Sequence, residues 1–205
     1  MQTPSYKYRE QWLNAALPLV TDQGWTEPAL LRAAEIAGLD AGQQALAAPG
    51  GINDVIDHMF ERASDEARAA LKDRDLDAYR THEKVAEALM AWLDALEPHR
   101  GAVRKAVQRG VMPWAAAAAG QQVWRTADWI WDAAGDTAED YNRYTKRGLL
   151  SAVIPSAVNY WLDEPTVDAL HGHISMRLQQ AMRLGQMGGR VLGPILERLS
   201  ARGAA

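Results

Sequence analysis

Apolar residues recur three or four positions apart in almost every segment of the chain, which is the spacing of one face of a helix. Leu13, Leu17 and Val20 show this spacing near the start, and Ile52, Val55 and other residues repeat it later. Glycine and proline fall between the periodic segments rather than at strand-like spacing. The pattern predicts one helix ending at Gln23 and others over residues 27–37, 40–48, 52 onward, 85–96, 99–109, 113–134, 140–162, 167–185 and 191–201.

The first three predicted helices have the order of a helix-turn-helix. Thr26 is a candidate N-cap before Glu27 and Pro28, and Asp40 is a second one after Gly38. We therefore predict an all-α protein with three parts. Residues 1–60 form a helix-turn-helix-like bundle, residues 61–187 a larger helical bundle, and residues 188–205 a short amphipathic C-terminal helix and tail.

The charge of the helix-turn-helix-like segment argues against nucleic-acid binding. Residues 1–60 contain three lysines and arginines and seven acidic residues, and the only charge between Gly38 and Gly51 is Asp40. Proteins hold DNA chiefly by neutralising phosphates with cations, which this segment lacks. Gln43 and Gln44 have side chains able to read base edges, but no neighbouring cation holds them at a duplex. We expect the shape without DNA binding.

Composition and chain start favour a protein that does not cross a membrane. The chain has no cysteine, and no apolar run approaches the roughly 18 residues that a spanning helix needs. The first residues, MQTPSYKYREQW, lack the apolar stretch of a signal peptide. We expect a cytoplasmic protein that associates peripherally with membranes.

No recognisable catalytic or metal-binding pattern occurs. A di-iron site in a helical bundle needs two Glu-x-x-His pairs, and this chain has none; Asp168 with His171 is the nearest match. His171 and His173 are two residues apart on a predicted helix and point in different directions. Phosphate loops, dinucleotide fingerprints and serine nucleophile motifs are absent. We expect no enzyme, no cofactor and no metal.

The segment WIWDAAGDTAEDYNRYTKRGLLSAV, residues 129–153, resembles the signature of a known family. This is the coenzyme Q (ubiquinone) biosynthesis accessory lipid-binding protein family, the ninth of the Coq series. The similarity extends from Tyr8 to about Gly185. It implies a TetR-like fold and a non-catalytic homodimer. It also implies that the larger bundle binds an isoprenoid lipid or quinone precursor at a membrane surface and presents it to the di-iron hydroxylase of the pathway.

The same segment holds a candidate partner surface. Asp136 and Glu139 have the spacing of a capping box, which predicts a helix start. On the following helix one stripe contains Tyr141, Thr145, Gly148 and Ala152, and a second contains Asp140, Tyr144, Arg147 and Ser151. We expect the charged second stripe to face outward, because unpaired charges are costly to bury. The partner-binding candidates are Asp128, Asp140, Tyr144 and Arg147; the family resemblance favours this over a merely exposed aromatic. The family usually has an aromatic where this chain has Arg143.

The apolar residues offer candidates for lipid contact. Eight tryptophans accompany one phenylalanine, and such large rings line cavities or fill a core. The lipid-binding candidates are Met112, Trp124, Trp131, Leu149 and Val153.

One segment has the character of a membrane contact, and a second is rich in cations. The C-terminal stretch VLGPILERLSAR places apolar residues largely on one helical face with arginines elsewhere, which suits either an anionic bilayer or docking on protein. The membrane-binding candidates are Arg190, Val191, Leu192, Ile195, Leu196 and Leu199. The second stretch, PHRGAVRKAVQRG, contains four arginines and lysines and no acid, and we interpret it as a solvated face or a contact for anionic headgroups.

Two alternatives remain beside the accessory-protein hypothesis. One is a TetR-like transcriptional regulator with an apolar ligand. The other is a scaffold whose own side chains fill its interior.

Overall fold

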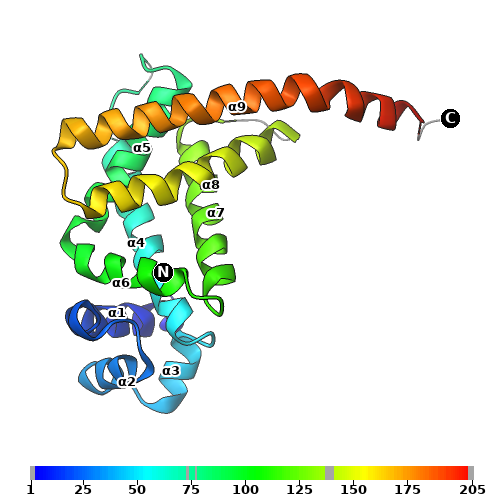
Figure 1. The fold of residues 1–205 in the computed structure, drawn as a ribbon. Helices are drawn as coiled ribbons and strands as arrows, with labels where there is room; N and C mark the ends of the chain where they lie inside the picture. Colours follow the sequence, from blue (N-terminus) through cyan, green and yellow to red (C-terminus); the bar gives the residue numbers. More distant parts are fainter. Residues whose placement is uncertain (1–2, 73, 77, 137–140, 203–205) are drawn as a thin grey trace. The chain divides into compact units, whose positions relative to one another are not determined.

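The computed structural model describes residues 3–72, 74–76, 78–136 and 141–202, and the side chains of these residues except 141, 142 and 185–202. Helices joined by short connections make up this part of the chain (Figure 1), which has no β-strand. The predicted all-α fold is confirmed. The helices are α1 (Pro4–Gln23), α2 (Glu27–Ile36), α3 (Ala41–Ala47), α4 (Ile52–Lys72), α5 (Thr81–Leu96), α6 (Arg100–Gly110), α7 (Ala116–Ala133), α8 (Tyr141–Leu162) and α9 (Val167–Arg202), with a 3₁₀ turn at Glu97–His99.

The chain divides into two compact units. The first unit contains Met1–Asp75 and Met90–Thr126, and the second contains Leu76–Leu89 and Ala127–Ala205. Helices α5 and α7 each contribute residues to both units. The predicted division of roles among residues 1–60, 61–187 and 188–205 stays a prediction.

The caps of α2 and α3 form as their sequences predict. The Thr26 hydroxyl accepts a hydrogen bond from the Ala29 N–H at 3.4 Å. The Asp40 carboxylate accepts one from the Gln43 N–H at 2.8 Å, while the Gln43 side chain accepts one from the Asp40 N–H at 2.9 Å. This reciprocal pair is a complete capping box. Local sequence therefore sets the helix-turn-helix-like geometry.

Tryptophans build much of the first unit's interior. Trp12, Trp25 and Trp92 are each at most 5% exposed. The indole of Trp12 donates to the Leu30 carbonyl and that of Trp25 to the Ala102 carbonyl, each at 2.9 Å. Burying Trp12 and Trp25 stabilises the unit because each indole N–H keeps a hydrogen-bond partner. The Trp92 indole N–H has no hydrogen-bond partner, and its ring stacks on Phe60 with 5.7 Å between ring centres. These three tryptophans therefore have a structural role.

Three helix boundaries differ by more than one residue from the sequence prediction. Helix α5 begins at Thr81 rather than at 85. Helix α7 begins at Ala116 rather than at 113, so residues 111–115 form a connection between α6 and α7. Helix α9 runs without a break to Arg202, through Gly188-Gly189 and Gly193-Pro194, whereas the sequence predicted a separate last helix over residues 191–201. Glycine and proline lower helix propensity without forbidding a helix, and here the helix continues.

Among the described residues, no helix is both long and apolar enough to span a bilayer.

Candidate functional site

Three aspartates line one side of the end of α7, in the second unit. Asp128 and Asp132 lie on the helix four residues apart, and Asp136 follows four residues later. Gly135 has a φ of 80°, and there the Gly135 N–H donates to the Asp132 carbonyl and the Asp136 N–H to the Trp131 carbonyl. This is the pattern of a Schellman motif, which glycine adopts without steric cost. The turn therefore places Asp136 beside the two helical aspartates.

Arg147 of α8 is the centre of these three carboxylates. Its side chain is 2% exposed. Nε donates to Asp128 Oδ1, Nη2 donates to Asp132 Oδ1 at 2.7 Å, and Nη1 donates to Asp136 Oδ2 at 3.1 Å. Each nitrogen of the guanidinium thus has its own carboxylate, which satisfies a buried cation that would otherwise be costly. We call Asp128, Asp132, Asp136 and Arg147 the arginine cluster.

Two more cations of α8 complete the charge balance. The Lys146 ammonium lies 2.6 Å from Asp136 Oδ1, and the Arg143 guanidinium lies 3.1 Å from Asp128 Oδ1. Three aspartates therefore face three cations. Trp131 fixes the same corner, since its indole donates to the Lys146 carbonyl at 3.1 Å and the Lys146 ammonium lies 5.4 Å from its ring centre. The corner between α7 and α8 is held by charge and by packing together.

The cluster shifts the pKa values of its members. Burial raises the pKa of Asp128, but hydrogen bonds and positive charge from Arg147 and Arg143 outweigh burial, so the pKa lies below the usual value of 3.8. Burial alone would lower the pKa of Arg147. Hydrogen bonds and negative charge from Asp128, Asp136 and Asp132 outweigh burial and raise this pKa above its usual value. Both groups are therefore held in their charged forms.

We expect acid to weaken this corner. A carboxyl with a lowered folded-state pKa stabilises the fold above its unfolded pKa, and this stability is lost as pH falls through the folded value. The free energy of unfolding should therefore decline below about pH 4. The decline should be shallower in an Arg147→Met variant, which lacks the cation that lowers the Asp128 pKa. Urea denaturation at a series of pH values measures both slopes; parallel slopes would contradict the assignment.

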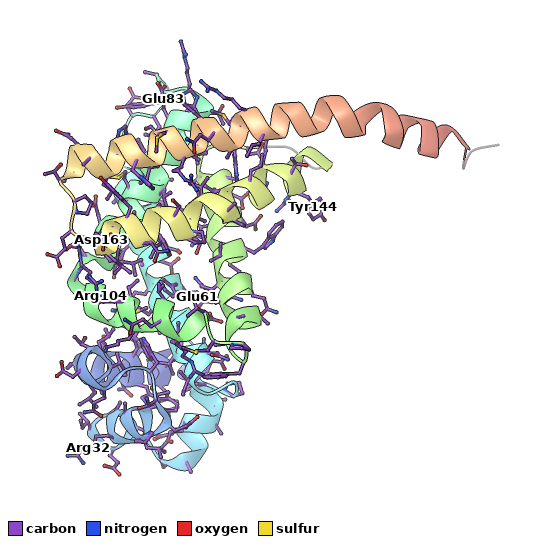
Figure 2. All side chains as sticks on the ribbon, in the orientation of Figure 1. Arg32, Glu61, Glu83, Arg104, Tyr144 and Asp163 are labelled. Atoms are coloured by element: carbon purple, nitrogen blue, oxygen red, sulfur yellow. The ribbon has the colours of Figure 1, made fainter. Side chains whose placement is uncertain are left out.

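Tyr144 lies one turn before Arg147 on α8 and is 64% exposed. Figure 2 shows it near the N-terminal end of this helix. The side chain of Arg143, the residue before it, is 41% exposed, and that of Asp128, with which Arg143 forms an ion pair, is 38% exposed. Tyrosine and arginine are among the residue types enriched at protein interfaces. Tyr144 is exposed, as the sequence predicted.

The predicted outward orientation of Arg147 is wrong. The expectation assumed that its charge had no partner, whereas three carboxylates surround it. Gly148 and Ala152, assigned to the opposite, inward stripe, are exposed instead. Asp132, Arg143 and Lys146 were not among the candidate residues. The spacing of acids at 128, 132 and 136 and of arginines at 143 and 147 was the signal that would have found them. Asp140 lies outside the described residues.

The lipid-binding candidates do not gather in one unit. Met112 and Trp124 belong to the first unit, and they are 40% and 38% exposed. Trp131, Leu149 and Val153 belong to the second unit, where Trp131 and Leu149 are half-buried and Val153 is buried. Their part in lipid binding stays a prediction. The side chains of the six membrane-binding candidates, Arg190, Val191, Leu192, Ile195, Leu196 and Leu199, lie outside the described residues.

The histidines of α9 have structural partners. The His173 ring stacks on Tyr160 with 4.3 Å between ring centres, and its Nε2 lies 3.1 Å from the Ser156 hydroxyl. His171 Nε2 lies 3.5 Å from a Glu87 carboxylate oxygen. Within the described part of the chain, no group of three or more histidine, aspartate or glutamate side chains is arranged to hold a metal ion.

The two glutamines of the helix-turn-helix-like segment are engaged within the protein. Gln43 takes part in the capping box, and Gln44 Nε2 donates to the Leu39 carbonyl at 2.9 Å. The large exposed side chains of this segment include the apolar Leu31, Ile36 and Leu46, each between 53% and 57% exposed. Base reading by these glutamines would require breaking bonds that fold the segment.

Comparison with known proteins points to one family. Residues 116–185 match the COQ9 family model. The chain is 26% identical over 162 residues to "Probable ubiquinone biosynthesis protein coq9, mitochondrial" of Dictyostelium discoideum, which covers 76% of this chain and 53% of the relative. It is 22% identical over 188 residues to "Ubiquinone biosynthesis protein COQ9, mitochondrial" of Homo sapiens. This match covers 87% of this chain and 59% of the relative. The chain thus spans little more than half the length of these relatives. The resemblance found in the sequence is confirmed.

A solved structure shares the fold. The crystal structure of the TetR transcriptional regulator from Nitrosomonas europaea matches with a TM-score of 0.65 and 19% identity, over 85% of this chain and 97% of that one. The predicted TetR-like fold is confirmed.

Proposed function

We propose that this chain is a non-catalytic accessory protein of ubiquinone biosynthesis that binds an isoprenoid quinone precursor and presents it to the di-iron hydroxylase of the pathway. The observation that carries the proposal is the COQ9 match over residues 116–185, which contains the whole arginine cluster and Tyr144. The names of the curated relatives support the pathway.

In this proposal the α7–α8 corner is the surface that meets the hydroxylase. The buried Arg147 does not itself contact the partner; it fixes the start of α8 against α7. Tyr144, 64% exposed, is the anchor, and the ion pair of Arg143 with Asp128 supplies charge to the same surface. A rigid aromatic anchor with a charged rim is the arrangement from which binding hot spots are built.

The remaining candidates define the lipid and membrane contacts. Leu149, Val153 and Trp131 are the lipid contacts proposed for the second unit, and Trp124 and Met112 are those proposed for the first. The C-terminal part of α9, with Leu192 and Leu196 on its apolar face, attaches the protein reversibly to a bilayer surface. The protein works as a peripheral membrane protein and as a homodimer, as the family resemblance implies.

Lipid analysis of the purified protein tests the proposal. We expect organic extracts of the full chain to contain an isoprenoid quinone precursor, identified by mass spectrometry, in amounts comparable with the protein. Leu149→Asn should lower this amount, because a polar amide in an apolar site binds a lipid less well. Leu46→Asn, on the exposed face of α3, is the matched control. Protein without isoprenoid lipid would instead support the scaffold alternative.

The TetR-like fold keeps a transcription regulator as the second candidate. The solved relative is a regulator by its title. Against this reading stand the acidic N-terminal segment and the internal hydrogen bonds of Gln43 and Gln44. Tight, salt-sensitive binding of duplex DNA at low ionic strength would favour the regulator.

A further inference from the structure

The connection between α6 and α7 exposes three large apolar side chains in succession. Val111 is 73% exposed, Met112 40% and Trp114 71%, and Pro113 between them is exposed as well. We call residues 111–115 the apolar loop. Its Trp114 contrasts with the buried tryptophans of the same unit, Trp12, Trp25 and Trp92. An isolated exposed apolar residue is ordinary, but three in one short loop mark a contact surface.

The sequence around the apolar loop is strongly cationic. From residue 98 to residue 127 the chain has five lysines and arginines and no acid. Four of these cations are on α6, where Figure 2 labels Arg104. Arg100 is paired with Glu97, and in the same unit Arg125 is paired with Asp57 at 2.6 Å. Lys105 and Arg109 are half-buried, lie one turn apart on α6, and lead directly into the loop.

Several backbone N–H groups in and around the apolar loop are hydrogen-bonded within the chain. The Met112 N–H donates to the Arg109 carbonyl, and the Ala115 and Ala116 N–H groups both donate to the Met112 carbonyl, each at 3.0 Å. Pro113 has no N–H to satisfy. At the base of the loop a Cβ on Gly110 would lie 3.1 Å from the Ala119 Cβ, so the two helix ends are close together. These bonds reduce the number of unpaired backbone groups that the turn brings to a lipid interface.

We propose that the apolar loop and the cations of α6 form a membrane-docking surface, which inserts Trp114 into the interface of an anionic lipid bilayer. Three features select a membrane rather than a protein partner. Indole rings prefer the boundary between headgroups and acyl chains. Lysines and arginines beside them meet anionic headgroups. The closed turn suits partial insertion. This contact lies on the first unit, goes beyond the proposed lipid presentation, and requires neither a bound quinone precursor nor the C-terminal part of α9.

Vesicle flotation of the full chain tests the proposal, using phosphatidylcholine vesicles with and without phosphatidylserine. We expect binding to the anionic vesicles that weakens as salt is added. Trp114→Ser should weaken this binding about tenfold, since a large apolar side chain leaves the interface. Lys105→Gln combined with Arg109→Gln should remove much of the preference for phosphatidylserine. Leu46→Ser is the matched control, because Leu46 is 53% exposed but lies in the acidic part of the same unit.

A second measurement locates Trp114 directly. Brominated acyl chains quench tryptophan fluorescence on contact, and we expect Trp114→Phe, which preserves apolar character, to lose this quenching while still floating. Leu192→Asp combined with Leu196→Asp should leave the quenching in place, because it removes only the contact proposed for α9.

Clear results would overturn the inference. These are flotation of Trp114→Ser equal to that of the wild type, equal loss in Trp114→Ser and Leu46→Ser, or no flotation of the wild-type chain. None of them affects the mass-spectrometric test of quinone binding, so the two proposals fail separately.

Discussion

Replacing Arg147 with methionine lowers the free energy of unfolding by about 3 kcal/mol, the largest stability effect that we expect from one substitution in the second unit. Methionine fills a similar volume but leaves three aspartates facing one another without their central cation. Removing one partner of a buried ion pair typically costs ~3–5 kcal/mol. We place this case at the lower end because the side chains of Asp128 and Asp132 are 38% and 57% exposed and keep contact with water.

Arg143→Met is the matched control for this experiment. Arg143 also contacts Asp128, at 3.1 Å, but its side chain is 41% exposed. An exposed ion pair contributes at most about 1 kcal/mol, so this substitution should change stability little. Urea denaturation followed by tryptophan fluorescence measures both variants. Equal effects of the two substitutions would show that Arg147 is not the structural centre of the corner.

Sequence reasoning succeeded where the determinants are local. The caps at Thr26 and Asp40 depend on side chains within three residues of the backbone groups that they satisfy, so a single sequence contains the whole interaction. The all-helical class followed from periodicity for the same reason. The resemblance carried by residues 129–153 then supplied the TetR-like arrangement, which periodicity alone does not specify.

The orientation of α8 was not predictable in the same way. Arg147 has a cost of burial that depends on residues from another helix, and that cost disappears only when Asp128, Asp132 and Asp136 are brought around it. A rule that treats each charge alone therefore assigns it to the surface. The apolar loop illustrates the same limit, since periodicity predicted a helix from residue 113, whereas α7 begins at Ala116 and leaves Met112 and Trp114 exposed in the connection.

From the proposed function, we expect replacement of Tyr144 with alanine to weaken capture of the hydroxylase by about 30-fold, which corresponds to a hot spot of about 2 kcal/mol. The ring is 64% exposed, so its removal uncovers little of the protein interior. Stability should therefore change by no more than about 0.5 kcal/mol. This separation of binding from folding distinguishes Tyr144 from Arg147, whose substitution lowers both because the α7–α8 corner loosens.

The measurement is a titration of the purified hydroxylase with each full-length variant, beside urea denaturation of the same preparations. Asn159→Ala is the control, because Asn159 is exposed on α8 but lies four turns beyond Tyr144. A Tyr144→Ala protein that binds as tightly as the wild type would remove the α7–α8 corner as the partner surface. A Tyr144→Ala protein that loses as much stability as the Arg147→Met protein would show instead that Tyr144 belongs to the core. Only loss of hydroxylase binding with unchanged stability supports Tyr144 as part of the partner surface, because that combination requires a ring that contacts the partner and not the protein interior.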